Sequence, residues 1–298
     1  MTLKKRLVLN SKKILDDRTY DRIESERTLC GSLVAHPPLI EVRSLSKSFT
    51  LKRRSLMAAK PILNVLKDIH LSISEGETVG LVGESGSGKS TLGSCIGGLL
   101  TVPGNTVFFK GKPLETLRGE AYQTYRKQVQ FVFQSPYESL NDRMKVAEII
   151  REPIRIHRLY STVNEENEAI NQLLVDVGLS ESVWNSYPRQ LSGGQCQRVA
   201  IARALSIKPK LIICDEAVSA LDVSVQATVL NLLKDIQLKY QVSYLFISHD
   251  LGVVRSISDR VLVIEKGRIV EEGSADVIFT DPKHPYTKEL LGAIPENF

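Results

Sequence analysis

A glycine-rich loop between a short apolar run and a helical stretch constrains this chain more than any other feature. The segment Gly83-Glu-Ser-Gly-Ser-Gly-Lys-Ser90 follows the apolar run Thr78–Val82 and precedes Thr91–Leu100, which has helical character. Glycines let a backbone wrap closely around phosphate oxygens, and the N–H groups at a helix N-terminus favour an anion. The segment therefore predicts a nucleotide phosphate-binding loop between a strand and a helix.

Two side chains of this loop carry the expected chemistry. The ammonium of Lys89 would neutralise β- and γ-phosphate oxygens, and the hydroxyl of Ser90 would ligate Mg²⁺. The loop predicts a nucleotide and Mg²⁺ as ligands. Its candidate nucleotide-binding residues are Gly83, Glu84, Ser85, Gly86, Ser87, Gly88, Lys89, Ser90 and Thr91.

A pair of carboxylates follows another apolar run. Leu211-Ile-Ile-Cys214 predicts a buried strand that delivers Asp215 at its carboxyl edge, beside the phosphate loop of an open α/β sheet. We expect Asp215 to hold Mg²⁺, through water, and Glu216 to act as general base for the attacking water. The alternative, a strand that ends in two solvated acids, is disfavoured by the phosphate loop.

A second helix start suited to phosphate lies at Leu191-Ser-Gly-Gly-Gln195. Ser192 and Gln195 have the spacing of a capping box, and Gly193 and Gly194 leave the first turn bare. Such an exposed helix N-terminus can receive a phosphate group. Because the chain already contains one phosphate loop, we expect this second start to serve the nucleotide of a neighbouring subunit.

The order of strand-like and helix-like segments predicts an α/β fold. The region from residue 39 to about residue 133 is rich in strand patterns, interrupted by a basic insert at residues 52–60 that predicts a hairpin loop. Residues 136–190 have helical spacing, with Thr162 and Glu165 as a second capping box. After them, short strands alternate with helices, which indicates a parallel sheet with crossover helices.

Composition and charge restrict the class of protein. The 298 residues carry a net charge of +5, and residues 1–38 hold eight basic side chains against five acidic ones. We interpret this basic arm as solvated, with binding to anionic lipid or nucleic acid as the alternative. It lacks the apolar core of a secretory signal, and the chain lacks an apolar run of the ~20 residues that span a membrane, so we expect a soluble or peripheral protein. The four cysteines form no CxxC pair, which argues against a zinc site or a disulfide framework and for reduced, cytosolic thiols.

The phosphate loop, the acidic strand end and Leu191–Gln195 together resemble the ATP-binding cassette (ABC) family. Within that resemblance Gln134, at the strand Phe131–Phe133, is similar to the glutamine of the family's Q-loop. Asp222, in Ser-Ala-Leu-Asp, is similar to its D-loop aspartate, and His249 is similar to its switch histidine. Phe49 stands where the family stacks an aromatic ring on adenine.

The resemblance covers about residues 39–295 and implies a P-loop NTPase core. The implied architecture combines a parallel sheet, an antiparallel β-subdomain and a helical subdomain, residues 136–190, inserted within the ATPase domain. Residues 1–38 would form the arm before this domain, and residues 296–298 a short tail.

The resemblance also implies how ATP would be hydrolysed. Two subunits would close head to tail around two ATP molecules, so that Ser192 and Gly194 of one chain complete the site of the other. His249 would hold the γ-phosphate and the attacking water, and Gln134 would bind Mg²⁺ and report its state. The implied catalytic residues are Glu216, His249 and Gln134, the Mg²⁺ ligands are Ser90, Gln134 and Asp215, and the in-trans signature is Ser192, Gly193, Gly194 and Gln195.

Three further segments resemble the oligopeptide/dipeptide importer ATPases, in particular the second of their two paired ATP-binding subunits. They are Phe133–Asn141, Ser219–Gln226 and His284–Thr287 with Ile294-Pro295. This implies an ATPase on the cytoplasmic face of the inner membrane, bound to two integral-membrane permeases and, indirectly, to a solute-binding protein. A second, non-identical ATPase subunit is expected in preference to a homodimer, and no nucleic acid is expected.

Two alternatives remain open at this point. The subfamily also contains nickel importers and ATPases linked to antimicrobial peptides. A different class, cassette proteins that act on DNA or ribosomes without transport, usually has a long coiled-coil insertion, zinc cysteines or two cassettes in one chain. The short span between Gln134 and Leu191, the cysteine spacing and the single cassette favour transport.

Overall fold

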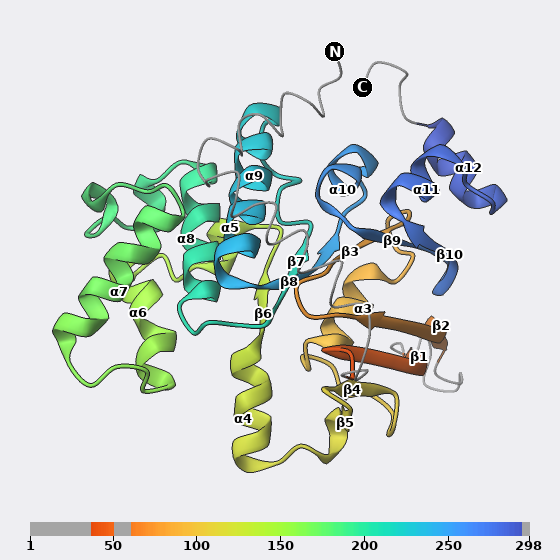
Figure 1. The fold of residues 1–298 in the computed structure, drawn as a ribbon, viewed down its shortest axis with the longest axis horizontal. Helices are drawn as coiled ribbons and strands as arrows, with labels where there is room; N and C mark the ends of the chain where they lie inside the picture. The colour runs from red at the N-terminus through yellow and green to blue at the C-terminus, as the bar shows by residue number, and fades with distance from the viewer. Residues whose placement is uncertain (1–36, 51–60, 294–298) are drawn as a thin grey trace, which may run out of the picture. The chain divides into compact units, whose positions relative to one another are not determined.

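The computed structural model describes residues 37–50 and 61–293 (Figure 1). The expected basic arm, except for its last two residues, lies outside the described residues, as do the basic insert and the tail. The described residues from Pro38 onward belong to one unit, and the fold given below is that of this unit. Nothing in this part of the chain tests where the predicted arm ends.

A six-stranded sheet forms the centre of the fold, in the order β10-β9-β3-β8-β7-β6. The strands from β9 to β6 are mutually parallel, and only β10 runs antiparallel, as the second strand of a hairpin with β9. The six strands are β3 (Thr78–Val82), β6 (Val129–Val132), β7 (Leu211–Asp215), β8 (Ser243–Ile247), β9 (Arg260–Glu265) and β10 (Arg268–Ser274). Their apolar runs are continuous because both faces of the parallel part are covered.

Alternate residues of these strands enter two different cores. Ile212 and Phe246 point into a core that contains the helices of the signature side, whereas Ile213 and Leu245 point into a second core on the opposite face. The second core is closed by a four-stranded antiparallel sheet in the order β2-β1-β4-β5 and by helix α3 (Lys89–Ile96). These strands are β1 (Ile40–Thr50), β2 (Ile62–Ile73), β4 (Val107–Phe109) and β5 (Lys112–Pro113).

The helices of the first core lie between β6 and β7 and after β7. Helix α8 (Gly193–Leu205) packs on β6, and the inserted helices α5 (Pro136–Ser139), α6 (Val146–Ile156) and α7 (Val163–Asp176) pack on α8. The 3-10 turns η2 (Glu181–Val183) and η3 (Pro188–Gln190) complete the insertion. The other helices are η1 (Leu114–Thr116), α4 (Gly119–Gln128), α9 (Val223–Tyr240), α10 (Leu251–Ile257), α11 (Ala275–Thr280) and α12 (Pro285–Gly292).

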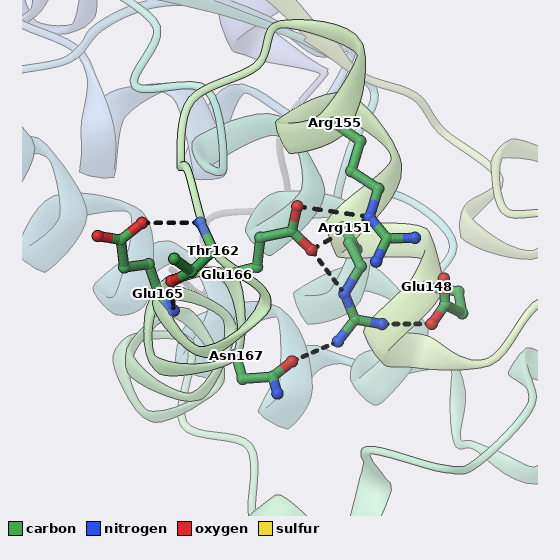
Figure 2. Close-up of polar contacts among 7 residues, drawn as sticks. All are labelled: Glu148, Arg151, Arg155, Thr162, Glu165, Glu166 and Asn167. Atoms are coloured by element: carbon green, nitrogen blue, oxygen red, sulfur yellow. Dashed lines mark hydrogen bonds and ion pairs between the residues drawn. The ribbon is translucent and has the colours of Figure 1, made fainter.

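A shielded ionic cluster joins the two long inserted helices (Figure 2). The Nε atom of Arg151, on α6, lies 3.4 Å from Oε2 of Glu166, on α7, and the same carboxylate oxygen lies 3.1 Å from Nε of Arg155. Arg151 also donates hydrogen bonds to Asn167, at 2.6 Å, and to Glu148. The side chains of Arg151 and Glu166 are only 8% and 11% exposed, so this pairing ties α6 to α7 away from bulk water.

The predicted α/β P-loop architecture is confirmed, and the differences concern element ends and helices that were not predicted, such as α4. Helix α3 begins at Lys89 and not at Thr91, so Lys89 and Ser90 occupy the first helical turn. Strand β6 ends at Val132, and Phe133 lies beyond it, with its ring stacked on Phe131 at 5.2 Å between centroids. The predicted capping box of α7 is present. Within residues 37–50 and 61–293, none of the helices combines the length and the apolar character that crossing a bilayer requires.

Candidate nucleotide site

Parallel strand pairing brings four of the predicted segments to one edge of the central sheet. Leu81 pairs with Ile247, Ile247 pairs with Asp215, and the next strand is in register through Val132 and Cys214. The loops after β3, β6, β7 and β8 therefore open at the same carboxyl edge, where open α/β sheets bind ligands. These loops carry the phosphate-binding segment, Gln134, Glu216 and His249.

The phosphate loop has a backbone that requires glycine. Gly83, Gly86 and Gly88 have φ angles of 155°, 80° and 109°, a region that other residues rarely adopt. A Cβ atom on Gly83 would lie 2.2 Å from the carbonyl oxygen of Ile264, and one on Gly88 would lie 2.9 Å from Leu66. The loop is thus packed against β9 and β2 from outside, which fixes its path.

Lys89 is the first residue of α3 and points back into this loop. Its buried ammonium donates hydrogen bonds to the carbonyl oxygens of Gly83, at 2.7 Å, and Glu84, at 2.8 Å. Burial lowers the pKa of the ammonium, and three nearby carboxylates oppose this shift: Glu216, Asp215 and Glu84. A cation is therefore already fixed inside the loop, at the position where phosphate oxygens are expected.

The next residue, Ser90, meets the acidic strand end. Its hydroxyl donates a hydrogen bond of 2.9 Å to Oδ1 of Asp215. Burial raises the pKa of Asp215, the hydrogen bond from Ser90 lowers it, and the charge of Glu216 raises it, with a net increase. A hydroxyl and a carboxylate side by side are oxygen donors of the kind that Mg²⁺ prefers, so these two residues fit the expected ion.

Gln134, the third predicted Mg²⁺ ligand, is less closely held. It lies two residues beyond β6 and is exposed to solvent. Among the hydrogen bonds of residues 37–50 and 61–293, none joins Gln134 to Ser90 or Asp215. Gln134 follows a strand that ends at this sheet edge, and its role as a ligand stays a prediction.

Glu216 and His249 form a pair at the ends of β7 and β8. The Nδ1 atom of His249 lies 3.2 Å from Oε1 of Glu216. Glu216 adopts a left-handed backbone conformation, with φ of 50°, and its N–H donates to the carbonyl oxygen of Ile247 at 2.9 Å. Such a conformation at a non-glycine residue stores about 1–3 kcal/mol of strain and is concentrated at functional sites. The turn directs the carboxylate toward the imidazole.

The predicted signature and D-loop residues lie at two neighbouring helix N-termini. The capping box of α8 is present: Ser192 Oγ accepts the N–H of Gln195 at 3.3 Å, and Gln195 Oε1 accepts the N–H of Ser192 at 2.9 Å. Gly194 faces α9 so closely that a Cβ atom there would lie 2.6 Å from Val225. Its neighbour Gly193 is half-buried, and a Cβ atom on it would lie 3.7 Å from Leu221.

Asp222 caps α9 beside this signature. Its Oδ1 accepts hydrogen bonds from the N–H of Val225, at 3.0 Å, and from the hydroxyl of Ser224, at 2.8 Å. The bond from Val225, followed by that from Ser224, lowers the pKa of Asp222, so its charge is favoured at the positive end of the helix. In the described part of the chain, residues 192–195 and Asp222 make no hydrogen bond with residues 83–91, which leaves the signature as a separate surface.

Phe49 lies on the β1–β2 hairpin that borders the phosphate loop. It pairs with Leu63, and Leu66, further along the same strand, is the residue that packs on Gly88. The ring is half-buried, and Nζ of Lys47 lies 5.5 Å from its centroid. The arrangement leaves the prediction of an adenine contact open.

Two contacts to the loop were not predicted from the sequence. The N–H of Glu84 donates a hydrogen bond of 3.0 Å to the hydroxyl of Tyr286, on α12. The N–H of Gly267, in the β9–β10 turn, donates a hydrogen bond of 2.9 Å to the carbonyl oxygen of Ser87. In the sequence, residues 284–287 stand out only by their resemblance to a subfamily. The spacing of residues along the chain does not predict a contact between Tyr286 and Glu84, which lie far apart in sequence.

Comparison with known families agrees with this geometry. Residues 66–219 match the family described as ABC transporter. Residues 270–298 match the family described as oligopeptide/dipeptide transporter, C-terminal region. The first match contains the phosphate loop, the signature and the acidic strand end, and the second contains Tyr286.

Three similar proteins extend the comparison. The oligopeptide transport ATP-binding protein OppF of Haemophilus influenzae is 48% identical over 86% of this chain and 78% of its own length. The dipeptide transport ATP-binding protein DppF of Lactococcus lactis subsp. cremoris is 45% identical over 86% of this chain and 81% of its own. The solved dimer of the ATP-binding cassette MJ0796, in a post-hydrolysis state with ADP and Pi, is 29% identical, with a TM-score of 0.69 over 79% of this chain and 98% of that one.

Proposed function

Since this chain belongs to the ABC transporter family, we propose that it is the ATP-hydrolysing subunit that energises a membrane importer of di- or oligopeptides. Peptides are favoured as the cargo because two relatives are named for oligopeptide and dipeptide transport. The match of residues 270–298 to the C-terminal region of such transporters supports the same cargo.

The proposal of ATP hydrolysis rests on the positions of two side-chain contacts. The Ser90–Asp215 contact and the Glu216–His249 contact lie at the ends of neighbouring strands, beside the loop that holds Lys89. A cation, two oxygen ligands and a general base are thus assembled around one place where a γ-phosphate can lie.

Each of these groups has a role in the transfer of the γ-phosphoryl group to water. The loop amides and Lys89 would bind the phosphates, and Ser90 and Asp215 would hold Mg²⁺, which would supply neutralising charge to the phosphates. Glu216 accepts the proton of the attacking water as its oxygen bonds to the γ-phosphorus and the bond to ADP breaks. His249, through its contact with Glu216, orients that carboxylate and reaches the γ-phosphate.

The signature acts on the nucleotide of a second subunit. Ser192 and the bare turn at Gly193 and Gly194 offer backbone N–H groups to a phosphate that the partner holds, and Asp222 lies at the same surface. The solved relative is a dimer with ADP and Pi. We favour a non-identical partner ATPase over a homodimer because of the resemblance to the second of two paired subunits.

The remaining assembly follows from the importer hypothesis. Gln134 would report the state of Mg²⁺ to the segment after it, and residues 136–143 with the rest of the helical subdomain, residues 136–190, would form the groove that grips a permease loop. Dimer closure and reopening would then drive transport through the two integral-membrane permeases. The chain would lie on the cytoplasmic face of the inner membrane as a peripheral subunit, with a solute-binding protein supplying the peptide from the other side.

The test is to recover the tagged Glu216→Gln chain from detergent-solubilised native membranes with Mg-ATP, and to identify its partners by mass spectrometry. This variant is expected to hold ATP and stay in the closed dimer. The control is the Glu216→Gln, Lys89→Ala double variant, which keeps the tag but should bind the nucleotide much more weakly.

The importer hypothesis predicts two polytopic permeases and a second cassette ATPase, with the ATPase partner enriched over the control. Recovery of ribosomal proteins or DNA-repair factors, with no membrane protein, would instead assign the chain to the class of cassette proteins without transport. Recovery of a nickel-binding protein, or of a partner linked to antimicrobial peptides, would change the proposed cargo and leave the assignment to a transporter intact.

A further inference from the structure

A tyrosine of the C-terminal region is hydrogen-bonded to the backbone of the phosphate loop. The hydroxyl oxygen of Tyr286, on α12, accepts a hydrogen bond of 3.0 Å from the N–H of Glu84. Tyr286 is 8% exposed, so its ring is packed in the protein interior and its hydroxyl faces the loop. Burial raises the pKa of this hydroxyl, which keeps it neutral at physiological pH.

The peptide unit that Tyr286 holds is the one that receives Lys89. The N–H of Glu84 and the carbonyl oxygen of Gly83 form one peptide unit, and that carbonyl oxygen accepts a hydrogen bond of 2.7 Å from Nζ of Lys89. The carbonyl oxygen of Glu84, in the next unit, accepts one of 2.8 Å from the same Nζ and one of 3.2 Å from the N–H of Ser87. Glu84 is therefore gripped on both sides, by Tyr286 at its N–H and by the loop at its carbonyl. Its side chain is exposed, so these backbone contacts set its position.

Tyr286 is itself fixed to the β9–β10 hairpin. The backbone N–H groups of Lys283 and His284 donate to the two carboxylate oxygens of Glu271, on β10, at 2.7 and 3.0 Å. His284 Nδ1 then caps α12 by accepting the N–H of Tyr286 at 3.3 Å. The turn of the same hairpin contacts the loop directly through Gly267, so the hairpin supports the loop once directly and once through α12.

We propose that Tyr286 is a positioning residue for ATP binding, whose hydroxyl fixes the Glu84 peptide and, through it, the ammonium of Lys89. The proposal rests on the proposed function of the loop as an ATP site. It assigns to the C-terminal region a role in nucleotide affinity that lies outside residues 66–219, the part that matches the general ABC family.

The Tyr286→Phe variant tests this proposal, because it removes the hydroxyl and keeps the ring. Loss of one such hydrogen bond is expected to raise the Kd of Mg-ATP roughly 3- to 10-fold. Calorimetry on the full chain gives both the Kd and the fraction of sites that bind. A tyrosine that only stabilised the fold would lower the binding fraction and leave the Kd of the folded molecules unchanged.

A matched control is Tyr244→Phe. The hydroxyl of Tyr244 is also buried and donates a hydrogen bond of 3.0 Å to the carbonyl oxygen of Leu233. Among the described residues, it makes no hydrogen bond with the phosphate loop. We expect this variant to bind Mg-ATP with wild-type Kd. Equal weakening in both phenylalanine variants would overturn the proposal.

The support of Tyr286 can also be weakened one step away, in case Tyr286→Phe yields too little folded protein to measure. Glu271→Gln keeps one oxygen in place of the two that accept from the N–H groups of Lys283 and His284 at the start of α12. This variant should raise the Kd of Mg-ATP in the same direction. In the Lys89→Ala background, which lacks the ammonium, Tyr286→Phe should have no further effect on Kd.

The outcomes separate the two proposals. An unchanged Kd of Mg-ATP in Tyr286→Phe, or a loss of affinity that persists in the Lys89→Ala background, would overturn the role of Tyr286 and leave the ATP site intact. Absence of Mg-ATP binding by the wild-type chain would overturn both.

Discussion

The Nδ1 atom of His249 lies 3.2 Å from Oε1 of Glu216, across the gap between the loops that follow two paired strands. The register of Asp215 with Ile247 sets this distance, because each side chain leaves its strand within two residues of that pair. Glu216 is 21% exposed and His249 57% exposed, so the pair lies at the mouth of the site, with the carboxylate on the inner side.

The first prediction concerns Glu216→Gln. The amide keeps an oxygen toward His249 but cannot accept the proton of the attacking water, so hydrolysis should fall by roughly 10²–10⁴-fold. Binding of Mg-ATP should persist, because the loop and Lys89 are unchanged. Phosphate release gives the rate and calorimetry the Kd, with Glu120→Gln on exposed α4 as the control. Wild-type turnover in Glu216→Gln would remove Glu216 as the base.

Lys89→Ala should act on binding itself. The ammonium is the buried cation of the loop, and a charge-assisted hydrogen bond contributes about 1.5–3 kcal/mol. The Kd of Mg-ATP should therefore rise by roughly 10- to 150-fold. Lys112→Ala, on exposed β5, removes the same charge from the surface and should bind normally. Equal affinity of Lys89→Ala and wild type would contradict the assigned role.

Most of this site could be predicted from the sequence because its residues follow local patterns. The phosphate loop, the capping box at Ser192 and the acidic end of β7 each depend on a few consecutive residues, and parallel strands bring such segments to one edge. The contact between Ser90 and Asp215 follows from that same topology.

Other parts depend on contacts that no local pattern encodes. Helix α4 was not predicted because it buries only Tyr125 and has no apolar stripe. The bond between Tyr286 and Glu84 joins residues 202 positions apart through a backbone N–H, which leaves no mark in the side-chain pattern. The exposed position of Gln134 likewise depends on where β6 ends.

Asp215→Asn should separate stability from binding. The pKa of Asp215 in the folded state is raised, mainly by burial. Protonation of Asp215 therefore stabilises the folded state fully at a pH below the unfolded-state pKa. This stabilisation is lost as the pH rises through the folded-state pKa. At pH 7 the charged carboxylate is therefore destabilising. The asparagine removes that charge and still accepts from Ser90, so the Tm without nucleotide should rise by roughly 2–4 °C.

The gain in Tm of Asp215→Asn over the wild type should disappear near pH 3, where Asp215 of the wild type is itself protonated. At pH 7 the variant should bind ATP more weakly than the wild type in the presence of Mg²⁺. Asp222→Asn is the control of opposite sign, because hydrogen bonds from Val225 and Ser224 lower the pKa of Asp222 and favour its charge. It should give no gain in Tm. A lower Tm for Asp215→Asn at pH 7 would show that the carboxylate stabilises the fold.

The last prediction concerns the ionic cluster of the helical subdomain (Figure 2). Glu166→Gln removes the charge that faces Arg151, whose side chain is 8% exposed, and leaves that guanidinium shielded with only exposed Glu148 as a carboxylate partner. Breaking a buried pair from one side destabilises a fold by about 3–5 kcal/mol, whereas an exposed pair contributes about 0–1 kcal/mol.

Glu148→Gln is the matched variant, because it removes the other carboxylate that pairs with Arg151. The side chain of Glu148 is 46% exposed. In urea unfolding monitored by circular dichroism, Glu166→Gln should lose several times more stability than Glu148→Gln. Both should keep the wild-type Kd for Mg-ATP, because the cluster makes no contact with the phosphate loop. Equal losses in the two variants would mean that water reaches Arg151 and that the pairing of α6 with α7 rests on their apolar contacts alone.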